Sequence, residues 1–466
     1  MSVINFSGIA SGIDSAALID ATIQSERAVR VSPSQKKVTG LEDTNSAFEQ
    51  LTTKLGTLQA SLKAMSSLSG GGVSKTATSG KESVMTATAS NAASNGSYSM
   101  TVSTLAKNHT LSFDQRLSSP TGAVQSSLTG AEPEANRTVT FTVGTGSNQE
   151  TVNVIVSGPT YSIADLVNEF NNASAKAEAS LVNVGTATVP SYAMVINSNN
   201  SGTEKGTIGV TVGGSLTNLS AYSQSAATDA TFSITGIGSV TRSTNTVADV
   251  VPGVTLSLVS AGTATISVSE DATTTQSKIQ SFIDSYNDIV TFNVENNQIS
   301  RDESGKEVKS VFGPLASTST DEGVLSALRD AISRARAEGG AAVRIFADIG
   351  ITTQRDGTLA FDTNKFQTGI SNEPSSVSEL LQSFADTVSL TGGTIDVFTR
   401  FNGILDITIN GNKTQISDLN NRIRDAEAQI QKNAENMKLR FSRLESLIGG
   451  LQQQGNSLSS ALAGLR

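Results

Sequence analysis

The chain has no cysteine and no tryptophan, and it has a single histidine, His109. Without cysteine it forms no disulfide and offers no thiolate nucleophile. One histidine cannot build the multi-histidine sites that bind zinc, so we expect His109 to be a structural residue and the chain to bind no cofactor. The absence of cysteine also suits a chain that is threaded unfolded through a narrow export channel, where a mispaired disulfide would block passage.

Charge is also scarce, because only 16% of the 466 residues are charged, and 37% are hydrophobic. Small polar residues fill the difference, which favours β-rich, water-facing domains over a dense enzyme core. The net charge of -9 argues against a nucleic-acid partner, which would favour a basic face. No apolar run is long enough for a membrane span. The length predicts about three domains.

Catalytic motifs are missing from the sequence. Both Gly-Lys pairs, at 80–81 and 305–306, are followed by glutamate, so neither belongs to a phosphate-binding loop. A Ser-His-Asp triad would have to use His109, and no nucleophile elbow is present. The acidic cluster at 302–307 is typical of a solvated loop. We therefore expect that the protein is not an enzyme.

The segment SGIASGIDSAALIDATI, residues 7–23, carries an apolar stripe near the N-terminus. It lacks the basic region and the unbroken apolar core of a cleaved signal peptide. Asp14 is predicted to cap a helix that runs to about Arg30, and Ser32 is predicted to cap a second helix with Pro33 in its first turn. The stripe residues assigned to an assembly seam are Ile13, Leu18, Ile19 and Ile23.

A heptad pattern follows and predicts a helix that stops at the glycine-rich stretch 69–74. The helix packs either within its own domain or against a partner helix, and the sequence leaves both possibilities open. We assign its apolar residues to a helix core, together with three residues that share one face of a later helix. These core residues are Leu41, Phe48, Leu51, Leu55, Leu58, Leu62, Ile279, Phe282 and Tyr286.

The C-terminal region has the clearest periodicity in the chain. Seven apolar residues recur at heptad spacing, whereas the companion position is mixed and includes Asn433 and Arg440. This pattern predicts a long helix with a narrow coiled-coil seam, and that seam is the natural cover for the N-terminal stripe. The seven residues are Ile416, Ile423, Ile430, Met437, Leu444, Leu451 and Leu458.

Between residues 84 and 272 the pattern changes to alternation of apolar and polar residues, separated by turn residues. This predicts antiparallel sheet in two β-rich lobes, interrupted by one helix at 162–173. Helices return at 275, and the segment 348–362 predicts a hairpin that turns at Asp356-Gly357. The fold class is therefore α+β multidomain, with terminal coiled-coil helices that enclose inserted antiparallel β-rich domains.

Four stretches together resemble the flagellar filament cap family, known as FliD or hook-associated protein 2. SGIASGIDSAALID is similar to the family's N-terminal signature, and YSMTVSTLAKNHTLSF to its first pair of strands. The stretch VADVVPGVTLSLVSAGTATISVSEDATTTQSKIQSFIDSYNDIV resembles its strand-to-helix junction. FADIGITTQRDGTLAFDTNKF resembles its C-terminal domain signature. The four stretches occur in order and frame nearly all of the chain.

The resemblance implies a structural protein of the bacterial flagellum that leaves the cell unfolded by type III export, without a cleaved signal peptide. Family members assemble at the distal tip of the filament, usually as a pentamer, with a plate of β domains and helical legs. A symmetry mismatch with the filament leaves gaps where exported flagellin folds and inserts, so the family is needed for elongation and motility. The implied partners are other copies of the chain, flagellin, the hook-filament junction proteins and an export chaperone.

The resemblance also gives names to the expected domains: a terminal coiled coil, a helical leg and a β-rich head. Their expected boundaries are 1–40 (export and coiled-coil segment), 41–83 (leg, first part), 84–135 (head, first part), 136–230 (outer head), 231–274 (head, second part), 275–410 (leg with hairpin, second part) and 411–466 (C-terminal coiled-coil helix).

Three other functions compete with a cap. A surface adhesin would use the β-rich lobes to bind host glycans or mucin, but it leaves the paired terminal heptads unexplained. Another axial component, such as flagellin or a junction protein, would also join its terminal helices, but the 348–362 hairpin argues against it. A secreted hydrolase would need a nucleophile and base that the sequence does not supply.

Overall fold

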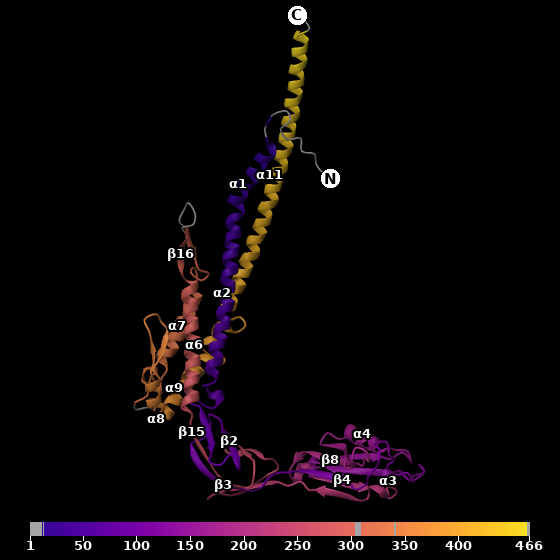
Figure 1. Ribbon diagram of the computed structural model, residues 1–466. Helices are drawn as coiled ribbons and strands as arrows, with labels where there is room; N and C mark the ends of the chain where they lie inside the picture. Colours follow the sequence, from indigo (N-terminus) through magenta and orange to yellow (C-terminus); the bar gives the residue numbers. More distant parts are fainter. Residues whose placement is uncertain (1–11, 13, 303–308, 340–341, 464–466) are drawn as a thin grey trace. The chain divides into compact units, whose positions relative to one another are not determined.

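The computed structural model in Figure 1 describes residues 12, 14–302, 309–339 and 342–463. It divides into a helical unit, Met1–Leu68 with Gln276–Arg466, and a β unit, Ser69–Thr275. The chain therefore leaves the helical unit after its first helices and returns to it some 200 residues later. The α+β fold class and the long C-terminal helix predicted from the sequence are confirmed.

Two helices open the helical unit, α1 (Ser15–Arg30) and α2 (Ser32–Lys63). Asp14 caps α1 as predicted, because its Oδ1 accepts a hydrogen bond of 3.0 Å from the Ala17 amide. The predicted cap at Ser32 is wrong. Val31 has helical backbone angles, and its carbonyl accepts a hydrogen bond from the Gln35 amide. The helical path therefore runs through Val31, and no side chain caps the start of α2.

The rest of the helical unit is made of helices and two short hairpins. Its elements are α6 (Ala272–Asn296), β16 (Ile299–Asp302), β17 (Lys309–Phe312), α7 (Thr320–Arg334), the 3-10 turn η4 (Phe346–Ile349), β18 (Ile351–Thr353), β19 (Leu359–Phe361), α8 (Thr363–Asn372), α9 (Pro374–Ser389), α10 (Thr394–Thr399) and α11 (Ile404–Ala463). Helix α2 packs on α9, α10 and α11, and α11 also packs on α1.

The predicted hairpin turn is confirmed as the connection between β18 and β19. Gly357 has a φ of +87°, a left-handed conformation that favours glycine, and Asp356 accepts a hydrogen bond from the Thr358 amide. The side chain of Asn287 on α6 bonds both the amide and the carbonyl of Leu359, at 2.7 and 2.9 Å. The hairpin is therefore held to α6 by hydrogen bonds between the Asn287 side chain and the backbone of Leu359.

The β unit contains two hydrophobic cores, each between antiparallel sheets. The first β domain has a five-stranded sheet, β1-β15-β3-β11-β12, and a three-stranded sheet, β13-β14-β2. Its strands are β1 (Lys75–Ser79), β2 (Met85–Ala89), β3 (Gly96–Thr104), β11 (Ala230–Ile234), β12 (Gly238–Arg242), β13 (Thr246–Val251), β14 (Val254–Leu258) and β15 (Gly262–Glu270). Alternate residues of these strands face the core, which matches the period-two pattern of the sequence.

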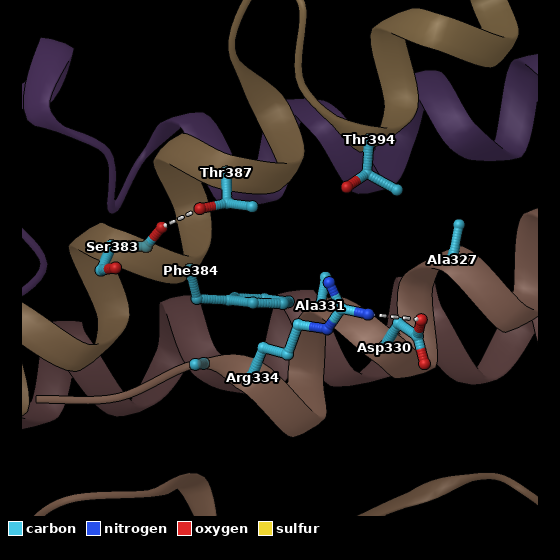
Figure 2. Close-up of a pocket in the computed structure, with 9 residues that line it drawn as sticks. Ala327, Asp330, Ala331, Arg334, Ser383, Phe384, Thr387 and Thr394 are labelled. Atoms are coloured by element: carbon cyan, nitrogen blue, oxygen red, sulfur yellow. Dashed lines mark hydrogen bonds and ion pairs between the residues drawn. The ribbon is translucent and has the colours of Figure 1, made fainter.

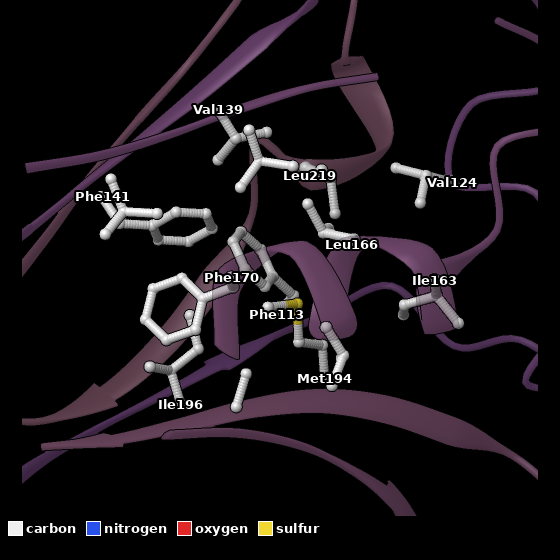
Figure 3. Packing of buried hydrophobic residues seen from close by; sticks show 14 of the residues in the cluster. Phe113, Val124, Val139, Phe141, Ile163, Leu166, Phe170, Met194, Ile196 and Leu219 are labelled. Atoms are coloured by element: carbon white, nitrogen blue, oxygen red, sulfur yellow. The ribbon is translucent and has the colours of Figure 1, made fainter. Parts of the chain in front are cut away.

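The second β domain lies between β3 and β11 in the chain and has sheets β10-β4-β8-β7 and β6-β5-β9, with the helix α4. Figure 3 shows Phe113, Phe141 and Phe170 together in its core, and the last two rings meet edge-on at 4.9 Å. Its elements are β4 (Asn108–Phe113), β5 (Thr138–Val143), β6 (Glu150–Ile155), α4 (Ile163–Ala173), β7 (Ala177–Asn183), β8 (Tyr192–Ser201), β9 (Ile208–Val212) and β10 (Tyr222–Ser225). Ser162 and Asp165 form a capping box at α4.

Candidate assembly interface

Both ring nitrogens of the single histidine, His109, have hydrogen-bond partners within the second β domain. The Ile208 amide donates to Nδ1 of His109 at 3.1 Å, and Nε2 lies 3.2 Å from Oε1 of Gln224. An Nδ1 that accepts requires the proton to be on Nε2, which then donates to Gln224. Burial lowers the pKa of His109 below its usual 6.5, more than the bond to Gln224 raises it. His109 therefore links β4, β9 and β10 as a neutral structural residue.

Among the described residues, no group of three or more histidine, aspartate and glutamate side chains could hold a metal ion. None of the described helices is long and apolar enough to cross a membrane. Exposed apolar side chains that recur at helical spacing lie on α11, in the helical unit.

Helices α1 and α2 run antiparallel to α11 along one side of the helical unit (Figure 1). Polar contacts set their register. Arg27 bonds Glu427 through Nε at 3.1 Å and Nη2 at 3.0 Å, and Nδ2 of Asn433 lies 3.3–3.4 Å from the Glu26 carboxylate. A polar residue at a seam position favours one alignment of the two helices over its neighbours.

Further along the pair, Nδ2 of Asn412 donates to Oδ1 of Asn45 at 2.8 Å. These contacts confirm the antiparallel arrangement, because residues further along α1 and α2 contact residues nearer the start of α11. Nearby, Ile416 lines a groove of about 330 Å³ between α2 and α11, together with Glu42 and Glu49. The groove is an open stretch of the interface between the two helices.

The seam residues assigned from the sequence occupy three environments. Ile430 is buried and only 2% exposed, whereas Ile19, Ile23, Ile416, Ile423 and Met437 are half-buried. Leu18 is 53% exposed, and Ile13 lies outside the described residues. The structure thus brings Ile430 and its neighbours into the contact between α1 and α11, and it leaves Leu18 on the surface.

The last part of α11 carries the same heptad with little cover. Leu444, Leu451 and Leu458 are 44%, 58% and 64% exposed, and Leu447 is exposed as well. These four residues, which we call the distal stripe, follow directly on the covered part of the seam. A contiguous apolar face on a water-facing helix is typical of an interaction site.

The residues assigned to a helix core lie inside the helical unit. Phe48, Leu51, Leu55, Leu58, Leu62, Ile279, Phe282 and Tyr286 are buried, and Leu41 is half-buried. The heptad of α2 therefore packs within its own unit, mainly against α9, α10 and α11, in this structure. Burial raises the pKa of Tyr286, whose hydroxyl donates to the Gly357 carbonyl at 3.3 Å.

Several contributors to the interface were not assigned from the sequence. Leu405 and Ile409 are buried on α11 and extend the apolar face ahead of the strict heptad, whereas the buried Leu419 stands at the mixed companion position of that heptad. Arg27 and Glu427 carry no sequence signal, because residues 400 positions apart cannot be paired from a single sequence.

Comparison with known families matches both ends of the chain to one family. The model described as Flagellar hook-associated protein 2 N-terminus matches residues 11–109, and the model described as Flagellar hook-associated protein 2 C-terminus matches residues 227–453. Together the two matches cover more than two thirds of the chain.

Similar proteins carry the same description. The flagellar hook-associated protein 2 of Escherichia coli K12 is 24% identical, over 99% of this chain and 98% of the relative. The A-type flagellar hook-associated protein 2 of Pseudomonas aeruginosa is 27% identical over 243 residues, which is 51% of this chain and only half, 50%, of the relative's length. The protein from Salmonella typhimurium is 25% identical over 62% of this chain and 64% of the relative.

A solved structure resembles the fold. The crystal structure of the D1-D2-D3 domains of the flagellar cap protein FliD from Escherichia coli aligns with a TM-score of 0.60 at 21% identity. The alignment covers 79% of this chain and 99% of that chain. At this identity the likeness concerns the fold alone.

Proposed function

This chain belongs to the flagellar hook-associated protein 2 family, the FliD family of filament cap proteins, and we propose that at the filament tip it promotes folding and insertion of exported flagellin and prevents its loss. Family members are structural proteins of the flagellum, at the tip of the filament. In this role the protein supports filament elongation and motility through binding surfaces and not through a catalytic site.

The observation that carries the proposal is the distal stripe. Leu444, Leu447, Leu451 and Leu458 are exposed and continue, toward the C-terminus, the seam that is buried at Ile430. Burying a leucine side chain stabilises a complex by about 1.5–3 kcal/mol, so four exposed leucines on one helix favour association. In the proposed cap, neighbouring copies and filament subunits cover the stripe.

The proposed assembly is a homo-oligomer, with five copies as the expected number. Its other proposed partners are flagellin, the hook-filament junction proteins and an export chaperone. We propose that the helical unit supplies the legs and terminal coiled coil and that the β unit supplies the plate. Type III export without a cleaved signal peptide would bring the chain to the filament tip, outside the cell.

Complementation of a strain that lacks its own cap gene tests the proposal. Cells that express this chain should swim and carry long filaments, and the medium should contain little unpolymerised flagellin. Cells with an empty vector should shed flagellin and stay non-motile. If expression and export of the chain are normal but flagellin is still shed, the proposed function is wrong.

A further inference from the structure

The distal stripe lies on a part of α11 that carries no charge. Residues 446–460 include no lysine, arginine, aspartate or glutamate, and their polar side chains are those of glutamine, asparagine and serine only. Charged residues recur throughout the part of the helix before it, and the last of these are Arg443 and Glu445. The residues from 450 to 460 are all exposed. A solvent-facing helix normally carries charged residues on its polar face, so this stretch differs from the rest of α11 in what it can contact.

The absence of charge favours contact between two identical helices. When copies of one helix pack in parallel and in register, each residue lies beside its own counterpart, so every charge on the contact face meets a like charge. Like charges placed opposite one another oppose association. Over residues 446–460 this repulsion is absent. It returns at Arg440, which stands seven residues before Leu447 and therefore at the same heptad position. A second copy thus fits the distal part of α11 and not the part before Leu444.

Gln454 favours one alignment of two copies over the others. It lies seven residues after Leu447 and three after Leu451, so it shares the face of the distal stripe, and it is exposed. A carboxamide both donates and accepts, so two Gln454 side chains that meet can satisfy one another. A shifted or antiparallel alignment cannot match both the glutamine and the leucines, and an amide left against apolar side chains without a partner costs free energy. A single polar residue in an apolar seam fixes the register in this way.

A pocket of about 290 Å³ between α7, α9 and α10 offers no such argument. Figure 2 shows Asp330 and Arg334 of α7 paired at this pocket, at 3.2 Å, so the pair presents no net charge to a partner. Phe384 of α9 is only 3% exposed and packs against Phe282 and Phe346, with ring centroids 5.3 and 4.9 Å apart. These side chains are held by their own chain, whereas the leucines of the distal stripe are exposed.

We propose that the distal stripe packs in parallel and in register against the distal stripe of a neighbouring copy of this chain, with Gln454 against Gln454. Burial of the leucines drives the contact, the uncharged stretch removes repulsion, and the glutamine pair selects the alignment. A rotation axis parallel to the helices brings like positions together, whether it relates two copies or five. The inference rests on the proposed function, in which neighbouring copies cover the stripe, and deepens it by naming the residues that meet.

Cysteine cross-linking tests the contact directly, because the chain has no cysteine of its own. Leu447→Cys and Gln454→Cys each place one thiol per copy on the stripe, and Gln453→Cys places it on the opposite face of the helix as the matched control. A disulfide needs Cα atoms within about 7 Å, so on mild oxidation the two stripe variants should form linked dimers at least about tenfold faster than the control. Slow or absent linkage at either stripe position, equal rates at all three positions, or a chain that stays monomeric would each overturn the inference.

A mixture of two cysteine variants tests the alignment. ¹⁵N-labelled Leu444→Cys chain and unlabelled Leu458→Cys chain are combined in equal amounts before assembly and oxidation. A parallel alignment joins like positions, so each disulfide should link two labelled chains or two unlabelled chains. An antiparallel alignment joins position 444 to position 458 and links chains of different label. The label separates these products by mass, and a majority of mixed products would overturn the proposed register.

Charged variants at position 454 give a second measurement on the full chain. Gln454→Lys and Gln454→Glu each place like charges opposite one another and should raise the concentration needed for half-assembly at least about tenfold. An equal mixture of the two variants should recover much of the assembly, because the lysine of one copy meets the glutamate of the next. Gln453→Lys carries the same charge on the opposite face and should assemble like the unmodified chain. Equal assembly of Gln454→Lys and the unmodified chain, or no recovery in the mixture, contradicts the contact.

These outcomes are separable from failure of the proposed function. If the unmodified chain complements a cap-deficient strain but the stripe cysteines do not link, the contact is wrong and the cap function stands. If the stripe cysteines link at like positions but the unmodified chain does not complement that strain, the contact stands and the cap function is wrong.

Discussion

Arg27 and Glu427 lie 400 residues apart in the chain and form an ion pair in which both Nε and Nη2 of the arginine bond the same carboxylate oxygen, at 3.1 and 3.0 Å. The pair shows that the N-terminal and C-terminal helices are in contact, because α1 and α11 meet although the whole β unit separates them in sequence. The side chains are 44% and 36% exposed, so their contribution is to alignment more than to stability.

A double-mutant cycle measures that contribution. Arg27→Ala and Glu427→Ala should show a coupling free energy of about 0.5 kcal/mol in thermal or urea unfolding, because solvent screens exposed pairs. The coupling should fade as salt is added. A coupling of several kcal/mol that persists at high salt would contradict the description of this pair as a surface contact.

Ile430 is the buried residue at the centre of the seam, at 2% exposure. Ile430→Asp places a carboxylate in an apolar contact and should cost at least about 3 kcal/mol of the packing between α1 and α11. Amide exchange in α1 should accelerate, filament elongation should fail, and the β unit should keep its circular dichroism signal. Gln431→Asp, at the exposed neighbouring position, is the control and should behave like the unmodified chain. Normal elongation with Ile430→Asp would contradict the role of the seam.

Asp321 at the start of α7 is 1% exposed and accepts hydrogen bonds from Asn293, Asn297 and Thr318, at 2.7, 2.6 and 2.5 Å. Asp321→Ala leaves the buried Asn293 and the half-buried Asn297 and Thr318 without their acceptor and should lower the free energy of unfolding by about 3 kcal/mol. Glu322→Ala removes an equal charge from the same turn, where the side chain is exposed, and should change it by less than about 0.5 kcal/mol. If the two variants lose the same free energy of unfolding in a chemical denaturation experiment, the hydrogen bonds to Asp321 do not stabilise the fold as described.

His109 predicts a pH dependence of stability. Burial lowers its pKa in the folded state, so below about pH 6.5 the unfolded chain binds a proton that the folded chain resists. The stabilisation is complete above that pH and is lost as the pH falls toward the folded-state pKa. His109→Gln should therefore show a shallower fall in melting temperature between about pH 7 and about pH 5.5. Identical slopes for the two proteins would exclude His109 as the group responsible.

Much of the fold could be predicted from local patterns in the sequence. The heptad of isoleucines and leucines after Ile416 predicts α11, alternation predicts the strands, and Asp356-Gly357 predicts the hairpin turn. These signals are local, because helix period, pleat and turn conformation depend on neighbours in the chain. The predicted cap at Ser32 failed because the backbone of Val31 continues the helical path, a property that no side chain encodes.

Apart from the pairing of the two terminal apolar segments, long-range contacts could not be predicted from the sequence. Strand β4 pairs with β8 and β10, and Lys54 bonds Asp288 at 2.6 Å between α2 and α6, but nothing in the sequence pattern indicates that these segments meet. For the same reason the heptad of α2 could not be assigned to its own unit or to a partner. The split of one seam into a covered part around Ile430 and an exposed part from Leu444 also depends on where α1 begins.

The most direct test of the cap assignment is filament length in a cap-deficient strain that expresses the double variant Leu444→Asp/Leu451→Asp. Both leucines are exposed, so the isolated protein should unfold within about 0.5 kcal/mol of the unmodified chain. Electron microscopy should show filaments that are short or absent, with flagellin in the medium, whereas Gln453→Asp, on the opposite face of the same exposed part of α11, should give full-length filaments. Full-length filaments from the double variant would contradict the claim that the distal stripe is the surface through which this chain caps the filament.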